Sequence, residues 1–397
     1  MPPSFKVHVA QSMSEIDAAQ WDACANPPAD TRRGADPYEI ERFNPFISHA
    51  FLTALETSKS VGARSGWTST HLLVKDADGR LVAAAPAYLK THSMGEYVFD
   101  HGWADAYHRA GLQYYPKLQV AVPFTPVTGR RLLVAPNQGE AARMTLIAGL
   151  RAWREKIEAS SIHITFPTHA EWEALGASGF LQRTGQQFHF LNKGYADFDA
   201  FLTDLASRKR KMIRRERKEA LANGITIELL TGADIKETHW DAFFFFYMDT
   251  GARKWGTPYL SREFFSAVGA AMSGHILLVM AKRDGRYIAG AINFIGKDAL
   301  YGRNWGAIEE HPFLHFEVCY YQAIEFAISR ALTRVEAGAQ GEHKLARGYR
   351  AVATFSAHDI GDTRFARAIE EYLETERLHI DEALREYEEA APFKKGP

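Results

Sequence analysis

The stretch HLLVKDADGRLVAAAPAYLK, residues 71–90, has a counterpart in LLVMAKRDGRYIAGAINFIG, residues 277–296. Each contains an apolar run, a turn with Asp-Gly and a second apolar run, a pattern that is typical of a β-hairpin. Asp78-Gly79-Arg80 aligns with Asp284-Gly285-Arg286 without a gap. The two stretches predict that one structural unit occurs twice in the chain.

The elements expected after each hairpin follow the same order. The first hairpin is followed by a strand-like segment at 97–100, a helix at about 139–158 and a strand at 162–166. The second is followed by a strand at 300–304, a helix at about 311–332 and a strand at 334–337. We therefore predict an α/β protein with mixed central sheets, divided into residues 1–190 and 191–397. The second half would carry the main site. It would also carry a basic helix at 198–221 near the junction, a strand at 225–230 and a charged helix at 363–389.

Composition narrows the class of protein. A chain of 397 residues with 46% hydrophobic residues is too long for one ordinary core, and its net charge of −1 provides no overall attraction for DNA. The two cysteines, Cys24 and Cys319, form no CxxC pair, which fits a reducing compartment. We find no HExxH pair, no phosphate loop and no GxSxG turn, so we predict no metal and no tightly bound cofactor. Without a long apolar run we predict a cytoplasmic protein, and peripheral contact with inner-membrane lipid stays open.

The segment 301–349 concentrates polar residues around a predicted strand end, where ligands gather in α/β folds. Acyl transfer to an amine needs a base, donors for the oxyanion and an acid for the leaving group. Candidate catalytic residues are Glu317, Glu336 and His343 as bases and Tyr320 or Tyr349 as acid. Candidate phosphate or oxyanion ligands are Arg303, Lys344 and Arg347. Taken singly, each of these residues also suits a structural role.

Two further segments are candidates for binding. The block at 97–129 contains Asp100, Trp103, Asp105 and Tyr107, which would bind the acceptor or pack within the protein. The run SRKRKMIRRERK, residues 207–218, holds eight basic residues and one acid. It is either a solvated face or an anion site for a phosphate-bearing cofactor, tRNA or acidic lipid. The anion-binding candidates are Arg210, Lys211, Arg214 and Arg215.

Three passages resemble the FemAB-like branch of the GNAT acyltransferase superfamily. They are residues 44–62 with 114–133, residues 207–220 followed by KWGTPYL at 254–260, and residues 315–349. The resemblance implies two tandem GNAT-like domains. It also implies a donor site at Arg303, Trp305, Gly306, Gln340, Lys344 and Arg347, and acceptor contacts at Lys254 and Trp255. The segment from Arg303 to Ile308 matches the superfamily's pyrophosphate loop only in part, because it lacks the final small residue.

The resemblance leads us to predict an N-acyltransferase that moves groups other than aminoacyl groups. Its similarity to bacterial ceramide synthases implies acyl-CoA as donor substrate and an amine acceptor such as a sphingoid base. Two alternatives stay open. One is transfer from aminoacyl-tRNA to a peptidoglycan precursor, with tRNA ranked behind acyl-CoA, and the other is a non-catalytic binding protein on a GNAT scaffold.

Overall fold

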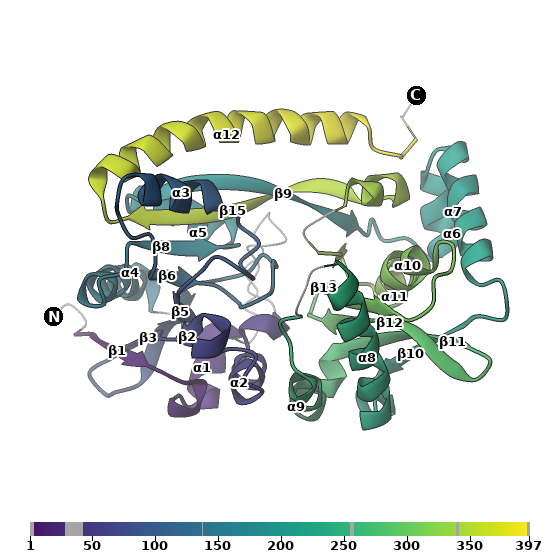
Figure 1. Ribbon diagram of the computed structural model, residues 1–397, viewed down its shortest axis with the longest axis horizontal. Coiled ribbons are helices and arrows are strands. Elements are labelled where there is room, and N and C mark those ends of the chain that lie inside the picture. Colours follow the sequence, from purple (N-terminus) through teal and green to yellow (C-terminus); the bar gives the residue numbers. More distant parts are fainter. Residues whose placement is uncertain (1–3, 28–42, 137, 255–257, 339–340, 395–397) are drawn as a thin grey trace. The chain divides into compact units, whose positions relative to one another are not determined.

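The structure is a computed structural model that describes residues 4–27, 43–136, 138–254, 258–338 and 341–394 (Figure 1). The chain divides into two compact units. Unit 1 comprises Met1–Gly185 and Ala353–Asp381, and unit 2 comprises Gln186–Val352 and Glu382–Pro397. The sequence analysis divided the chain between residues 190 and 191 and assigned residues 353–381 to the second half, whereas these units divide after Gly185 and place Ala353–Asp381 in unit 1.

Unit 1 contains two sheets. The first has the strand order β1 (Lys6–Ala10), β3 (His71–Lys75), β4 (Leu81–Ala85) and β7 (Leu133–Val134), all antiparallel. The second has the order β15 (Arg350–Ile360), β8 (Ser161–Thr165), β6 (Lys117–Val120), β5 (Ala87–Lys90) and β2 (Trp67–Ser69). The β6–β8 pair is parallel and the other pairs are antiparallel, so the second sheet is mixed. The unit's helices are α1 (Ala18–Ala25), α2 (His49–Thr57), α3 (His101–Arg109), α4 (Gly139–Lys156) and α5 (His169–Ala177), and α12 (Thr363–Glu389) begins in it.

The second sheet of unit 1 has one apolar and one polar face, and both are buried. Leu118 and Ile162 pack with α4 in the apolar core. Strand pairing places Tyr88, Gln119, His163 and His358 in one row across four neighbouring strands. These four side chains are at most 2% exposed. Because buried polar groups require hydrogen-bond partners, this face must be occupied by a polar network.

Unit 2 contains one mixed sheet. Its strand order is β10 (Thr226–Thr231), β11 (Ile276–Arg283), β12 (Arg286–Ile295), β13 (Ala299–Ala307), β14 (Arg334–Glu336) and β9 (Leu181–Leu191). Only the β13–β14 pair is parallel. The helices of this unit are α6 (Phe198–Asp204), α7 (Ser207–Ala220), α8 (Glu237–Lys254), α9 (Arg262–Met272), α10 (Leu314–Phe316) and α11 (Gln322–Ser329). Helix α8 packs on β12 and β13, and α11 packs on β13 and β14 (Figure 1).

Both predicted hairpins are confirmed as β3–β4 and β11–β12, and the mixed sheets agree with the predicted fold class.

Two local predictions of secondary structure are wrong. Residues 97–100 form no strand, because Tyr97 adopts a left-handed φ of 61° and the neighbouring Glu96 and Asp100 are drawn into the polar network of unit 1. The helix expected at 198–221 is two helices, because Leu205 is extended with ψ 152°. Among the described residues, no helix is both long enough and apolar enough to cross a membrane.

Gly306 in β13 provides a test of the packing between α8 and the sheet. A Cβ atom at Gly306 would lie 2.3 Å from the backbone of Phe246 in α8, whereas one at Gly274 would have no heavy atom within 4 Å. Gly306→Ala should therefore lower the free energy of unfolding by about 2 kcal/mol or more. Gly274→Ala should change it by less than about 0.5 kcal/mol. Urea denaturation followed by circular dichroism measures both, and equal effects would contradict the close packing.

Candidate functional site

The centre of unit 2 is shaped by the short pairing between its two parallel strands. Residues 299–301 of β13 pair with residues 334–336 of β14. β14 ends at Glu336, whereas β13 continues to Ala307. A cavity of about 80 Å³ lies where the two strands part, lined on this side by Gly302 to Trp305 and by Ala337.

A register shift in β13 contributes to this opening. Asn293 of β12 pairs with Gly302, but the next residue, Ile292, pairs with Asn304, so the register shifts by one residue at Arg303. Such a bulge bends a strand and re-aims side chains, and bulges are frequent beside active sites. Arg303 and Asn304 both line the cavity.

The opposite wall comes from a π-helical turn, Glu317–Tyr321, between α10 and α11. A π turn inserts an additional residue and often marks a functional position. Cys319 and Tyr320 of this turn line the cavity together with His315. Glu317 and Tyr321 instead contact α7, where they bond Arg217 and Glu216. The turn therefore directs some side chains into the cavity and anchors others to α7.

Tyr320 and His343 form the pair best placed for proton transfer. The Tyr320 hydroxyl lies 2.9 Å from Nε2 of His343. Burial raises the pKa of Tyr320, so its hydroxyl keeps its proton at neutral pH. Burial, with the nearby charges of Arg347 and Lys344, lowers the pKa of His343, which is therefore a neutral imidazole near pH 7. The sequence predicted both residues as catalytic, and the structure brings them together.

Lys344 and Arg347 lie beside this pair with different partners. Lys344 is 1% exposed, its Nζ donates to the Gly338 carbonyl at 2.8 Å, and burial with the positive charge of Arg303 lowers its pKa to about 7. Arg347 donates to Glu216 at 2.8 Å and to the His343 carbonyl at 2.7 Å, and its guanidinium lies over the Phe316 ring at 3.5 Å. Arg347 thus fixes the backbone of His343.

The two glutamates predicted as bases are held by arginines. Glu317 is completely buried and accepts from Arg217 at 2.8 and 3.0 Å. Glu336 accepts from Arg334 at 2.8 Å, and neither glutamate is among the described residues that line the cavity.

The remaining predicted donor and acceptor residues of unit 2 are scattered. Trp305 lines the cavity and packs edge-on against His315 with ring centroids 5.1 Å apart. Gly306 packs on α8, as described above. Gln340, Trp255 and the side chain of Lys254 lie outside the described residues.

The predicted anion helix corresponds to α7, whose two faces differ. Ile213, Glu216 and Ala220 are buried on the inner face. Among the predicted anion ligands, Arg214 pairs with Asp199 at 2.8 Å and Arg215 with Glu219 at 3.2 Å. Lys211 is exposed and Arg210 is half-buried.

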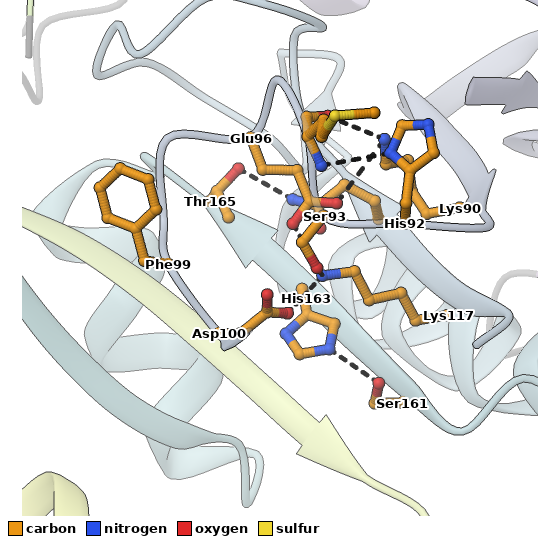
Figure 2. A network of polar contacts seen from close by, with 12 residues as sticks. Lys90, His92, Ser93, Glu96, Phe99, Asp100, Lys117, Ser161, His163 and Thr165 are labelled. Atoms are coloured by element: carbon orange, nitrogen blue, oxygen red, sulfur yellow. Dashed lines mark hydrogen bonds and ion pairs between the residues drawn. The ribbon is translucent and has the colours of Figure 1, made fainter. Parts of the chain in front are cut away.

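The predicted acceptor residues of the first half surround the polar network of unit 1. Figure 2 shows Lys117 at the centre of this network. Its Nζ donates to Ser93 Oγ at 2.8 Å, to Glu96 Oε2 at 2.7 Å and to Asp100. Trp103 stacks on His163, Tyr107 packs on Phe365, and Asp105 is exposed. The structure therefore brings Asp100 and Trp103 together with His163, but not Asp105.

The charges of this network perturb one another. Burial lowers the pKa of Lys90 to about 7 and raises that of Glu96 to about 7. Burial alone would raise the pKa of Asp100, but the Lys117 ammonium holds it below its ordinary value. A chain of hydrogen bonds continues from Asp100 through Tyr114 to His163 and from His163 to His358.

Several residues of the two sites were not predicted from the sequence. They are Asn293, His315 and Cys319 at the cavity, Glu216 and Arg217 on α7, and Lys90, Glu96, Lys117, His163 and His358 in unit 1. Glu216 had a usable signal, since it is the single acid in the basic run. Among the described residues, no group of three histidine, cysteine or carboxylate side chains is placed to hold a metal ion.

Lys117→Met tests whether this ammonium compensates the two buried carboxylates. Removing it leaves Glu96 and Asp100 without their common donor, so the free energy of unfolding at pH 7 should fall by about 3–5 kcal/mol. The deficit should shrink towards pH 5, because without Lys117 the pKa of each buried carboxyl rises and protonation removes its charge. Urea denaturation at both pH values measures this, with exposed Lys6→Met as the control. A deficit that is independent of pH would indicate lost packing instead.

Comparisons with known proteins identify the fold and the family. The model of the FemAB-like family, described as peptidoglycan biosynthesis/recognition, matches residues 12–395. The crystal structure of FemX matches with a TM-score of 0.53 and 13% identity, covering 91% of this chain and 100% of that chain. The C-terminal domain of a putative lysylphosphatidylglycerol synthetase from Agrobacterium fabrum matches with a TM-score of 0.53 and 8% identity, covering 91% and 96%. L-PGS from Bacillus licheniformis matches with a TM-score of 0.50 and 8% identity, covering 83% and 96%. No curated protein matches the sequence.

These matches confirm the predicted fold class of two GNAT-like domains with mixed sheets. They also correct one prediction. The statement that the transferred group is other than aminoacyl is wrong, because the FemAB-like family, FemX and the lysylphosphatidylglycerol synthetases point to aminoacyl transfer. The ceramide-synthase-like grouping and the acyl-CoA donor find no support in these matches. With a family model that covers nearly the whole chain, the protein belongs to the FemAB-like family and has the fold of its GNAT-type transferases.

Proposed function

We propose that the protein transfers an aminoacyl group from aminoacyl-tRNA to an amine of a peptidoglycan precursor. The observation that carries the proposal is the cavity between β13 and β14, with Tyr320 at its wall and His343 hydrogen-bonded to Tyr320. The family's description supports a peptidoglycan-related acceptor, and the solved structures named above support an aminoacyl group.

The reaction requires one proton to move while one bond replaces another. The acceptor nitrogen attacks the ester carbonyl, the N–C bond forms, and the C–O bond to the ribose of the tRNA breaks. The nitrogen loses a proton, which the neutral imidazole of His343 can take. The imidazole can then return a proton to Tyr320 across their 2.9 Å contact, and Tyr320 can give its own proton to the leaving ribose oxygen.

The outer face of α7 is the proposed contact for the tRNA backbone. Arg208, Lys211 and Lys218 are exposed there, and no described residue forms an ion pair with any of them. The inner face of α7 packs against the π turn that bears Tyr320. A phosphate backbone on α7 would thus lie beside the cavity wall.

Tyr320→Phe tests the proposed proton transfer. The hydroxyl is lost while the ring is kept, so kcat should fall about 100-fold or more, with a smaller change in KM. The assay combines alanyl-, glycyl- and seryl-tRNA with a muramoyl-pentapeptide precursor and detects the product by mass spectrometry. Tyr372→Phe, at a half-exposed position on α12, is the control and should leave the rate unchanged.

The outcomes of this assay separate the alternatives. Loss of activity in Tyr320→Phe with an unchanged melting temperature supports the assignment of the cavity at Tyr320 as the active site. Equal rates in both tyrosine variants would contradict the role of Tyr320. No aminoacyl product from any donor, together with release of free CoA from an acyl-CoA and an amine, would overturn the proposed function.

The contact between α7 and tRNA predicts a specific dependence on salt. Each phosphate contact contributes about 0.7–0.9 to the slope of log K against log salt. Replacing Arg208, Lys211 and Lys218 by Gln should therefore reduce the slope by about 2–3, measured by filter binding of tRNA between 50 and 200 mM salt. Arg214→Gln with Arg215→Gln is the matched control, because both arginines are exposed on the same helix but paired with acids. A larger reduction in the control than in the triple variant would contradict the assignment.

A further inference from the structure

We propose that Asn293 recognises the free α-amino group of the aminoacyl donor. This inference rests on the proposed function and adds a specificity residue to it. Asn293 lies in β12, is 1% exposed and lines the cavity.

The orientation of the Asn293 amide follows from its neighbours. Its Nδ2 points to two backbone carbonyls, those of Leu277 at 3.3 Å and Ala291 at 3.5 Å. Turning the amide around would place Oδ1 against two acceptors, so the oxygen belongs on the other side. That oxygen is buried and has no hydrogen-bond partner among the described residues.

Oδ1 of Asn293 is directed towards the point where the strands part. A Cβ atom built on Gly302, the strand partner of Asn293, would lie 3.3 Å from this oxygen. Gly302 also lines the cavity, so the oxygen and the space above Gly302 belong to one site. A buried acceptor that lacks a donor costs about 1–3 kcal/mol, and a ligand N–H would offset that cost.

The charges of the residues that line the cavity indicate which kind of amine can bind to Asn293. None of the described residues lining the cavity is a carboxylate, and Arg303 is their one charged side chain. A permanent ammonium such as that of lysine, with a pKa near 10.4, would meet an amide oxygen and a guanidinium but no counter-charge. An α-amino group, with an ordinary pKa of about 8, can enter uncharged near neutral pH and still donate an N–H.

The experiment compares kcat/KM for alanyl-tRNA and N-acetyl-alanyl-tRNA, in which the amine is blocked. The wild type should prefer the free amine by about 100-fold. Asn293→Leu keeps the number and branching of the side-chain heavy atoms but removes the acceptor, so its rate with alanyl-tRNA should fall at least 10-fold while its rate with the blocked donor stays the same. Asn293→Asp keeps an oxygen acceptor and should retain the preference.

The possible results lead to distinct conclusions. If Asn293→Leu slows both donors equally, or if it keeps the full wild-type preference for the free amine, the inference is overturned and the oxygen serves only a bound water. If the wild type transfers from neither donor, the proposed function fails first and the inference fails with it. Unchanged melting temperature and tRNA affinity in Asn293→Leu exclude misfolding, and Asn293→Asp provides the second variant should Asn293→Leu fail to fold.

Discussion

Three residues of parallel strand pairing determine the site in unit 2. Because β14 ends at Glu336, no described strand pairs with the carboxyl half of β13 on that side, and Gly302 to Trp305 line a cavity there. Ligands in α/β folds gather where neighbouring strands part. The parting of β13 and β14 therefore favours this place for a ligand, independently of which ligand it is. The bulge at Arg303 adds a polar side chain at the same place.

The π turn and the basic helix hold the facing wall in position through buried ion pairs. Glu216 and Arg217 are adjacent on α7, yet Glu216 bonds Arg347 of the loop that carries His343, and Arg217 bonds Glu317 of the π turn. Buried ion pairs contribute little net stability because desolvation offsets their attraction, but removing one partner is strongly destabilising. We therefore interpret these pairs as positioning elements that set His343 relative to Tyr320. Within this arrangement, the carboxylate of Glu317 anchors the π turn to α7 through Arg217.

The sequence predicted the repeated hairpins, the long helices and the concentration of polar residues in 301–349, because apolar periodicity and turn residues are local signals. It gave His343, Tyr320 and Glu317 equal rank as catalytic candidates. The ion pair that holds Glu317 could not be foreseen, because its partner Arg217 lies 100 residues away in the sequence. Asn293 looked like one polar residue in an apolar strand, and only strand pairing shows that its oxygen faces Gly302. The donor was predicted from resemblance, and the imperfect loop at Arg303 already weakened acyl-CoA.

Both units bury polar groups, and they differ in what lies beside the unpaired atoms. In unit 1 the Lys117 ammonium donates to Ser93, Glu96 and Asp100 together, yet Oε1 of Glu96 and Oδ1 of Asp100 have no hydrogen-bond partner among the described residues. In unit 2 the paired charges lie behind the cavity wall, and the amide oxygen of Asn293, which lines the cavity, is unpaired among the described residues. An unsatisfied buried acceptor costs free energy wherever it lies, so the unpaired oxygen alone does not distinguish the units. The cavity beside that oxygen is what favours unit 2 as the place for a ligand.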